Sequence, residues 1–356
     1  MNFEVSKPVG ALRQEAKYTM KTTNKSVLSI GLTALLTACG GGGGGDAAPA
    51  APAAQTPQAA TTVAGTTAAM YAVGGEEANA FNLLNKARIE CGFGALTQNL
   101  SLDRAAAAHA SFLITNGLNY GHTEVDALPG FTGQTPQSRA QTQGYSLPVD
   151  EDLSTRSGAA GLPGQLRTTR EVSALLAAPY HSMSLLNNFA DAGIGFSQVQ
   201  TAAAPGIAAT EKIALVFNLG LRSGLNDLAA DTVYTYPCAG TTGASTNLPN
   251  ESPSPIPSTL TQDYRLFGAP ITVKVRAGQV LNLTTAAITP AAGGAAIQNQ
   301  IVTISNDPQS GALMKASDSF VLPLKPLQPG TTYQVNLTGT NSGTPFSKSF
   351  SYSTGQ

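Results

Sequence analysis

Apolar residues recur at helical spacing in one part of this 356-residue chain, and that spacing is lost after about residue 260. One set of apolar residues that lie three or four positions apart is Ala80, Leu84, Ala87 and Cys91. This spacing predicts an amphipathic helix over about 76–90, with Gly92 as its stop signal. The same spacing from residue 102 predicts a second helix, which ends at Asn116-Gly117.

A third helix and a buried sheet are predicted further along the chain. The helix begins at Thr168, because Thr-x-x-Glu to Glu171 fits a capping box, and it ends before Pro179. Two strand-like runs follow at 192–196 and 213–219, and the second is apolar at nearly every position. Such a strand is typically covered on both faces of its sheet. Helices together with a covered sheet predict a three-layer domain.

The last part of the chain has the pattern of an all-β domain. Short apolar segments separated by Gly, Pro, Asn or Ser lie at 271–275, 280–283, 301–304, 320–324, 333–337 and 346–352. Several short strands at this spacing, with turn residues between them, predict a β-sandwich.

Two stretches of unusual composition divide the chain. The run from Gly40 is polyglycine followed mostly by Ala, Pro, Thr and Gln, which bury too little apolar surface to offset the entropy of ordering. It predicts a disordered tether over 39–70. A proline-rich stretch predicts an extended linker over 241–259. The predicted parts are therefore 1–38 (N-terminal extension and signal peptide), 39–70 (tether), 71–240 (first domain), 241–259 (linker) and 260–356 (β-sandwich).

The segment 20–39 has the order of a secretion signal, with a basic start, a short apolar core and small residues before Cys39. Its apolar core is too short to span a bilayer of about 30 Å as a helix. Leu36-Thr37-Ala38-Cys39 resembles the bacterial lipobox, whose cysteine receives diacylglycerol and becomes the new N-terminus. This resemblance implies a lipoprotein that is anchored to a membrane through Cys39. Gly40 after the cysteine implies the outer membrane of a Gram-negative bacterium.

Two further cysteines remain once lipid occupies the first. Cys91 and Cys238 form an even pair in an oxidising compartment, which predicts a disulfide. Two unpaired buried thiols are the alternative.

All three histidines lie in the first predicted domain. His109 shares the apolar face of the second predicted helix, which favours a buried, hydrogen-bonded residue. His122 follows the stop signal of that helix, in a loop of the kind that commonly carries function. His181 follows Pro179. Apolar periodicity explains neither of these two positions, so both are candidate site residues.

Several short motifs occur in a recognisable order over about 75–238. They are Asn85-x-x-Arg88, His122, Pro136-x-x-Arg139 with Gly144-Tyr145, Glu151, Ala178-Pro179-Tyr180-His181 and Ala192-Gly-Ile-Gly195. The ordered set resembles the bacterial type of the CAP superfamily, also called SCP-like proteins. In addition, the run 327–333 resembles the turn before the tyrosine-corner strand of fibronectin type III and immunoglobulin-like domains. Together the resemblances imply an α+β chain in which a CAP-like α-β-α sandwich is followed by an all-β sandwich.

The CAP resemblance also implies a cleft lined by two histidines and two acidic residues. His122 and His181 match the histidines. Glu151 lies in Val-Asp-Glu-Asp-Leu, where many relatives have Gly-Glu-Asn, and it matches the first carboxylate. Glu171 is the candidate second carboxylate, although the predicted capping box explains the same residue, and Glu124 is another candidate. The tryptophan that often precedes the second histidine is absent, since the chain has no Trp.

Two imidazoles and one or two carboxylates can bind Zn²⁺ or another divalent ion with one coordination position open. The candidate metal ligands are therefore His122, Glu151, Glu171 and His181. A hydrogen-bonded network that holds the cleft in shape without metal is the alternative.

The function implied is that of an envelope-exposed binding or interaction module. Its ligand would be a lipid, a sterol-like molecule or an envelope polymer. The alternatives are a metal-dependent hydrolase of peptides or envelope polymers, in which the metal activates a water, and a purely structural or adhesive role. No nucleophile stands out in the sequence, so enzymatic activity is left open. The chain has 20 Lys and Arg against 21 Asp and Glu and no basic stripe, which argues against nucleic acid as a partner.

Overall fold

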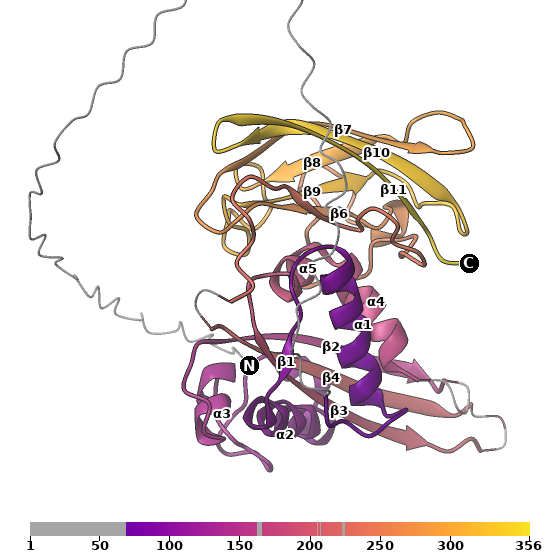
Figure 1. Ribbon diagram of the computed structural model, residues 1–356. Helices are drawn as coiled ribbons and strands as arrows, with labels where there is room; N and C mark the ends of the chain where they lie inside the picture. Colours follow the sequence, from indigo (N-terminus) through magenta and orange to yellow (C-terminus); the bar gives the residue numbers. More distant parts are fainter. Residues whose placement is uncertain (1–68, 162–165, 205, 207, 223–224) are drawn as a thin grey trace, which may run out of the picture. The chain divides into compact units, whose positions relative to one another are not determined.

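The computed structural model describes residues 69–161, 166–204, 206, 208–222 and 225–356 (Figure 1). All of these residues belong to one compact unit, Ala51–Gln356. The predicted signal peptide, the lipidation site Cys39 and nearly all of the predicted tether lie outside the described residues. Among the described residues, no helix combines the length and the hydrophobicity that crossing a bilayer requires.

The first sheet has four strands in the order β1-β3-β4-β2. Their bounds are β1 Thr97–Gln98, β2 Val149–Ala159, β3 Asp191–Thr201 and β4 Thr210–Gly220. β1 runs parallel to β3, and the other pairs are antiparallel. β4 is buried at almost every position, which confirms the prediction that this strand is covered on both faces.

Helices pack against both faces of this sheet, because successive residues of β4 belong alternately to two different cores. Ala214 and Val216 contact α2 (Leu100–Asn116), whereas Leu215 and Phe217 belong to the core that includes α1 (Glu76–Glu90) and α4 (Thr168–Ala177). α2 lies so close to β3 that a Cβ atom at Gly193 would overlap the backbone of Leu102. The three predicted helices are confirmed. Two further helices, α3 (Pro136–Thr142) and α5 (Pro179–Leu185), and the short η1 (Leu118–Tyr120) were not predicted.

α4 begins differently from the prediction. The predicted capping box is wrong, because no side chain of α4 caps its own N-terminus. Instead, Glu76 at the start of α1 accepts hydrogen bonds from the backbone N–H groups of Arg167 (2.9 Å) and Thr168 (3.0 Å). A carboxylate from another helix therefore satisfies the orphan donors at this terminus.

Two antiparallel sheets follow, in the orders β5-β6-β9-β8 and β11-β10-β7. Their bounds are β5 Tyr234–Tyr236, β6 Ile271–Lys274, β7 Leu281–Pro290, β8 Asn299–Thr303, β9 Asp318–Pro323, β10 Thr332–Asn341 and β11 Thr344–Ser353, with a short η2 at Tyr264–Leu266. Val273 and Val321 of the first sheet share a core with Val335 and Phe350 of the second. The two sheets thus pack face to face, and all six predicted strand segments after residue 260 lie at strands.

The sheet β5-β6-β9-β8 is covered on its second face as well. Phe320 and Leu322 of β9 share a core with Met183 of α5 and with Phe267. All residues of β6 and β9 are consequently buried. Figure 1 shows α5 between the first sheet and this one.

The expected fold class is wrong. A CAP-like α-β-α sandwich followed by a separate all-β sandwich is not what the chain forms. It is a mixed α and β unit with three sheets, and β5, which precedes residue 240, pairs with β6 of the C-terminal part. The predicted linker range also packs into the molecule, since Leu248 and Ile256 are buried in the core around Met183. A sheet that needs α5 to cover one of its faces cannot be completed by the C-terminal residues alone.

Cys91 and Cys238 form a disulfide, as predicted. The bond joins the C-terminal end of α1 to the segment that follows β5, across 147 residues of sequence.

Candidate functional site

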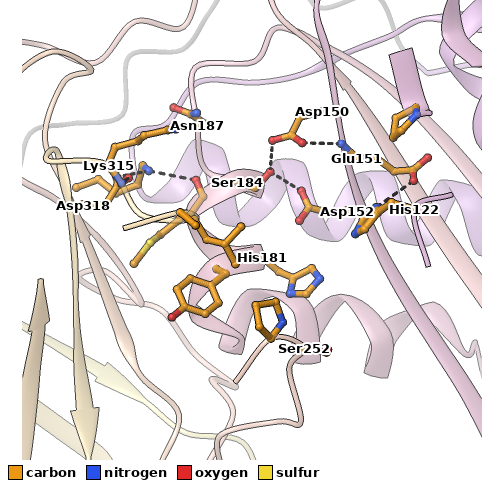
Figure 2. Close-up of a pocket in the computed structure, with 17 residues that line it drawn as sticks. His122, Asp150, Glu151, Asp152, His181, Ser184, Asn187, Ser252, Lys315 and Asp318 are labelled. Carbon is orange, nitrogen blue, oxygen red and sulfur yellow. Dashed lines mark hydrogen bonds and ion pairs between the residues drawn. The ribbon is translucent and has the colours of Figure 1, made fainter. Parts of the chain in front are cut away.

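A cleft lies between β2 and α5, and it consists of two adjacent hollows. One has a volume of about 430 Å³ and the other of about 480 Å³. Three residues, His122, His181 and Ser252, line both hollows. Figure 2 shows the first hollow, with Asp150, Glu151 and Asp152 following one another along β2. The two histidines singled out from the sequence therefore meet in one concave place.

His122 is held by the carboxylate of Glu151. Its Nδ1 lies 3.1 Å from Glu151 Oε1, and the imidazole is about half exposed, at 49%. Its Nε2 has no hydrogen-bond partner among the described residues. A carboxylate at Nδ1 fixes the ring orientation and the tautomer, which leaves Nε2 as the atom that can meet a ligand.

Glu151 is itself held in place by buried hydrogen-bond donors. Arg139, which is fully buried on α3, donates from Nη2 to both oxygens of Glu151 (2.8 and 2.7 Å) and from Nη1 to the carbonyl of His122 (3.1 Å). With the Asn218 amide oriented so that its oxygen accepts from the N–H of Ala106, its nitrogen donates to Glu151 Oε2 at 3.0 Å. Buried charges are tolerated only when they are paired in this way.

His181 is held by a second carboxylate, that of Glu251. Glu251 Oε1 accepts from the backbone N–H of His181 (2.9 Å) and lies 2.6 Å from its Nδ1. Burial by itself would lower the pKa of His181. The hydrogen bond with Glu251 and the negative charges of Asp152 and Asp150 outweigh burial and raise the pKa above its ordinary value. The cleft thus contains two carboxylate–histidine pairs.

A third acidic group sits between the two pairs. Ser184 of α5 lies 3.0 Å from Asp150 Oδ2 and 2.7 Å from Asp152 Oδ2, so its hydroxyl links the two carboxyl groups. Burial raises the pKa of Asp152 to about 7, and the negative charge of Asp150 acts in the same direction. Asp152 therefore gains or loses a proton near neutral pH.

His109 is buried on α2, which confirms the prediction of a hydrogen-bonded core histidine. Its Nε2 donates to the carbonyl of Gly121 (2.8 Å), and its Nδ1 lies 2.9 Å from Glu124 Oε1. Burial favours a higher pKa for Glu124, but hydrogen bonds from His109 and the Thr132 backbone, with the charge of Arg139, lower it. Glu124, the other candidate for the second carboxylate, therefore stabilises the loop that carries His122.

Glu171 does not line either hollow of the cleft. Its carboxylate accepts from the hydroxyl of Ser154 (2.7 Å) and from Arg156 Nε (3.1 Å). Arg156 also pairs with Glu211. Of the four candidate metal ligands, the structure brings His122, Glu151 and His181 to the cleft and places Glu171 in a separate ion-pair cluster.

The expected ligand set does not fit a metal ion in this arrangement. The oxygens of Glu151 are occupied by Arg139 and His122, and those of Glu171 by Ser154 and Arg156. Across the described parts of the chain, no group of three or more His, Cys, Asp or Glu side chains is arranged to hold a metal. Of the expected ligand set, the imidazole Nε2 atoms of His122 and His181 are the ligand atoms that have no hydrogen-bond partner among the described residues.

Sequence reasoning missed Asp150, Asp152, Ser184 and Glu251. Both aspartates stand in the segment that carries Glu151, and in a strand they point to the opposite face from it. That alternation could have identified them as a second acidic pair. No local signal marks Glu251, which lies 70 residues beyond His181 in the predicted linker.

A comparison with protein families and with curated proteins finds no match for this chain.

Proposed function

We propose that this chain is a binding protein of the bacterial cell envelope whose cleft takes a polar ligand at two carboxylate-supported histidines. The single observation that carries the proposal is the presence of the pairs Glu151–His122 and Glu251–His181 on one cleft. In both pairs the carboxylate holds Nδ1, so that both Nε2 atoms are available to a ligand. Two such pairs in one cleft form a preorganised binding site.

The walls of the cleft favour a polar ligand over a lipid. Asp150, Asp152 and Ser184 line one hollow, and Asn119, Asn250 and Glu251 line the other. An acyl chain or a sterol would leave these groups without water and without partners, which costs free energy at each of them. Of the ligands considered from the sequence, a polymer of the envelope fits this chemistry best.

Kinship with the CAP superfamily is also a proposal, and the geometry of its first motif supports it. Arg88 is fully buried and donates to the backbone carbonyls of Phe93, Gly94, Leu185, Asn187 and Phe189. Asn85 exchanges two hydrogen bonds with the backbone of Leu96. Arg88 thus ties the end of α1 to the distant segment 185–189, and Asn85 ties α1 to the segment that follows it, which is a reason for these residue types at this spacing.

The test is a screen for ligands that bind the full chain in detergent. Binding is detected as a rise in the unfolding temperature. The probes are short peptides, N-acetylglucosamine oligomers, palmitate and Zn²⁺. We expect a polar probe to raise the unfolding temperature, and we expect His122→Ala and His181→Ala to abolish the effect. Arg265→Ala, at an exposed surface pair with Asp263, is the control. Stabilisation by palmitate alone, unchanged in the histidine variants, would contradict the proposal.

The membrane anchor is proposed from the lipobox pattern around Cys39. Cys39→Ser should prevent lipid attachment and release the chain from the membrane fraction, because a single cysteine carries the anchor. Metabolic labelling with a palmitate analogue measures the lipid, and fractionation measures the location. A labelled Cys39→Ser chain would refute the assignment.

The metal-dependent hydrolase is not carried further, because the expected ligands are occupied by other partners. Zn²⁺ remains among the probes as an independent measurement of whether the two open imidazoles bind it.

A further inference from the structure

The hollow of about 480 Å³ is bordered by the free edge of the first sheet. β2 is the last strand in the order β1-β3-β4-β2, and Leu153, Ser154 and Thr155 of β2 line this hollow. Leu118 and Asn119 of η1 lie along one side, and Ala174, Leu175 and Ala178 at the C-terminal end of α4 lie along the other. The hollow is therefore a groove along a strand that has a neighbour on one side only.

The register of β2 against β4 determines which backbone groups face this groove. Just beyond the two ends of β2, Leu221 N–H donates to Pro148 C=O, and Ala160 N–H donates to Ala209 C=O. In each of these bonds the two residues lie directly opposite each other in the register of β2 against β4. In an antiparallel ladder every second residue bonds to the partner strand. The even-numbered residues of β2 thus bond to β4, and the N–H and C=O groups of Leu153 and Thr155 point away from it.

These outward groups have no hydrogen-bond partner in the described part of the chain. The contrast with Glu151 is informative, because its outward N–H is satisfied by the side chain of Asp150 at 3.0 Å. Natural proteins usually cover or block an exposed strand edge. Beside this groove, the edge is left open at Leu153 and Thr155.

A second, independent group in the same groove also lacks a partner. Glu251 is 6% exposed, and its Oε2 is buried without any hydrogen bond, while Oε1 accepts from His181. A buried carboxylate oxygen that has no donor is costly, and an ammonium group is the donor that compensates it best. Asp152 and Asp150 add negative charge on the adjacent part of the cleft.

We propose that this groove binds an extended peptide that adds to the edge of β2 and places an amino group against Glu251 Oε2. The proposal deepens the proposed function and rests on it, since His122 and His181 line the same groove. The backbone of the peptide pairs with Leu153 and Thr155, which recur at the two-residue period of any strand. Its amino group, from a lysine side chain or a free N-terminus, neutralises Glu251. An oligosaccharide has no alternating N–H and C=O groups at this spacing and cannot complete the ladder.

The test measures the affinity of the full chain, in detergent, for two fluorescent hexapeptides by anisotropy. Both consist of alanine and valine with blocked ends, and the third residue is lysine in one and norleucine in the other. We expect the lysine peptide to bind and the norleucine peptide to bind at least several-fold more weakly. Glu251→Gln keeps an acceptor for His181 and replaces Oε2 by a donor, so it should remove the preference for lysine.

Two proline substitutions test the ladder. Thr155→Pro removes an outward N–H and leaves the bonds from β2 to β4 in place, as proline is tolerated on edge strands. It should lower the affinity for the lysine peptide about tenfold, because one hydrogen bond of the ladder is lost and the peptide backbone can no longer approach the strand closely there. Ser157→Pro makes the same change at an outward position of β2 outside the groove and should leave the affinity unchanged. Thermal unfolding of both variants controls for folding.

Equal affinity in Thr155→Pro and the wild type, with both folded, would overturn the proposal, as would equal binding of the two peptides to the wild type. If an N-acetylglucosamine oligomer binds in a histidine-dependent way and neither peptide binds, the peptide proposal fails and the proposed function stands. If no polar probe binds, both fail.

Discussion

At the scale of single residues, the site depends on how its histidines and carboxyl groups are paired. Sequence reasoning identified His122, His181 and Glu151, because neither histidine position is explained by helix periodicity and because their order resembles a known family. It did not identify Glu251. Its contact with His181 exists only because the segment around residue 251 folds back onto α5, and such long-range contacts leave no local pattern in the sequence.

Replacing Glu251 by Gln should lower the pKa of His181. The hydrogen bond with Glu251 is the largest influence that raises this pKa, and burial opposes it. In the wild type the raised pKa contributes stability that is fully present below the pKa of the unfolded chain, about 6.5, and is lost as the pH rises through the folded value. Titration of the His181 ring signals by NMR measures the pKa directly. The control is the titration of His122, which Glu151 holds. An unchanged His181 titration would show that Glu251 does not hold this ring.

Replacing Asp152 by Asn should change how stability depends on pH. The folded pKa is about 7 and the ordinary value 3.8, so between these values the folded chain binds more protons than the unfolded chain. Stability should therefore fall as the pH rises from about 4 to about 7 in the wild type. Asp152→Asn should remove this slope and gain up to about 4 kcal/mol relative to the wild type at pH 8, since the shift of about 3 pKa units corresponds to 1.36 kcal/mol per unit. Urea unfolding at pH 5 and pH 8 measures the free energy of unfolding of both proteins. If that free energy changed with pH in the same way in the wild type and the variant, the result would count against the burial of this carboxyl group.

At the scale of elements, helices and strands were largely predictable, whereas their ends and their partners were not. α1 occupies the predicted range, and β4 shows the predicted continuous burial. The start of α4 was predicted in the right place for the wrong reason. Thr168 and Glu171 have the spacing of a capping box, but Ser154 and Arg156 compete for Glu171 and Glu76 occupies the N-terminus of α4. A local motif does not reveal which distant groups will compete for it.

Replacing Glu76 by Ala should destabilise the chain through α4. The carboxylate accepts two backbone N–H groups and the hydroxyl of Thr168, so its removal leaves the first turn without partners. We expect a loss of about 1–2 kcal/mol in the free energy of unfolding, the usual cost of a lost N-terminal cap. Glu77→Ala, in the same turn of α1, is the matched control. Urea denaturation measures both, and equal effects of the two substitutions would refute the capping role.

At the scale of the whole molecule, α5 connects the parts that were predicted to be separate. Ser182 and Met183 face the sheet β5-β6-β9-β8, where Lys274 donates to the carbonyl of Met183 and pairs with Asp318. Ser184 and His181 line the cleft against β2. One helix of seven residues thus serves two packing surfaces and the candidate site.

A chain that ends at residue 240 should not fold cooperatively. It lacks β6, so β5 has no strand to pair with, and the apolar surface around Met183 is exposed to water. We expect it to aggregate or to unfold without a sharp thermal transition. The control is a chain of residues 69–356, which keeps every described contact. A truncated chain that unfolds in a single sharp thermal transition would contradict this expectation.

The sequence by itself determined most of the segments that become helices and strands, that two cysteines pair, and that two histidines stand outside the periodic core. These properties depend on neighbours along the chain, on hydrophobic period and on residue chemistry. Only the tertiary structure decided that the C-terminal sheet needs α5 as a cover, that Glu251 supports His181 and that the edge of β2 borders the cleft. These depend on which apolar faces remain uncovered when the elements meet, a balance of burial among distant segments that no short stretch of sequence contains.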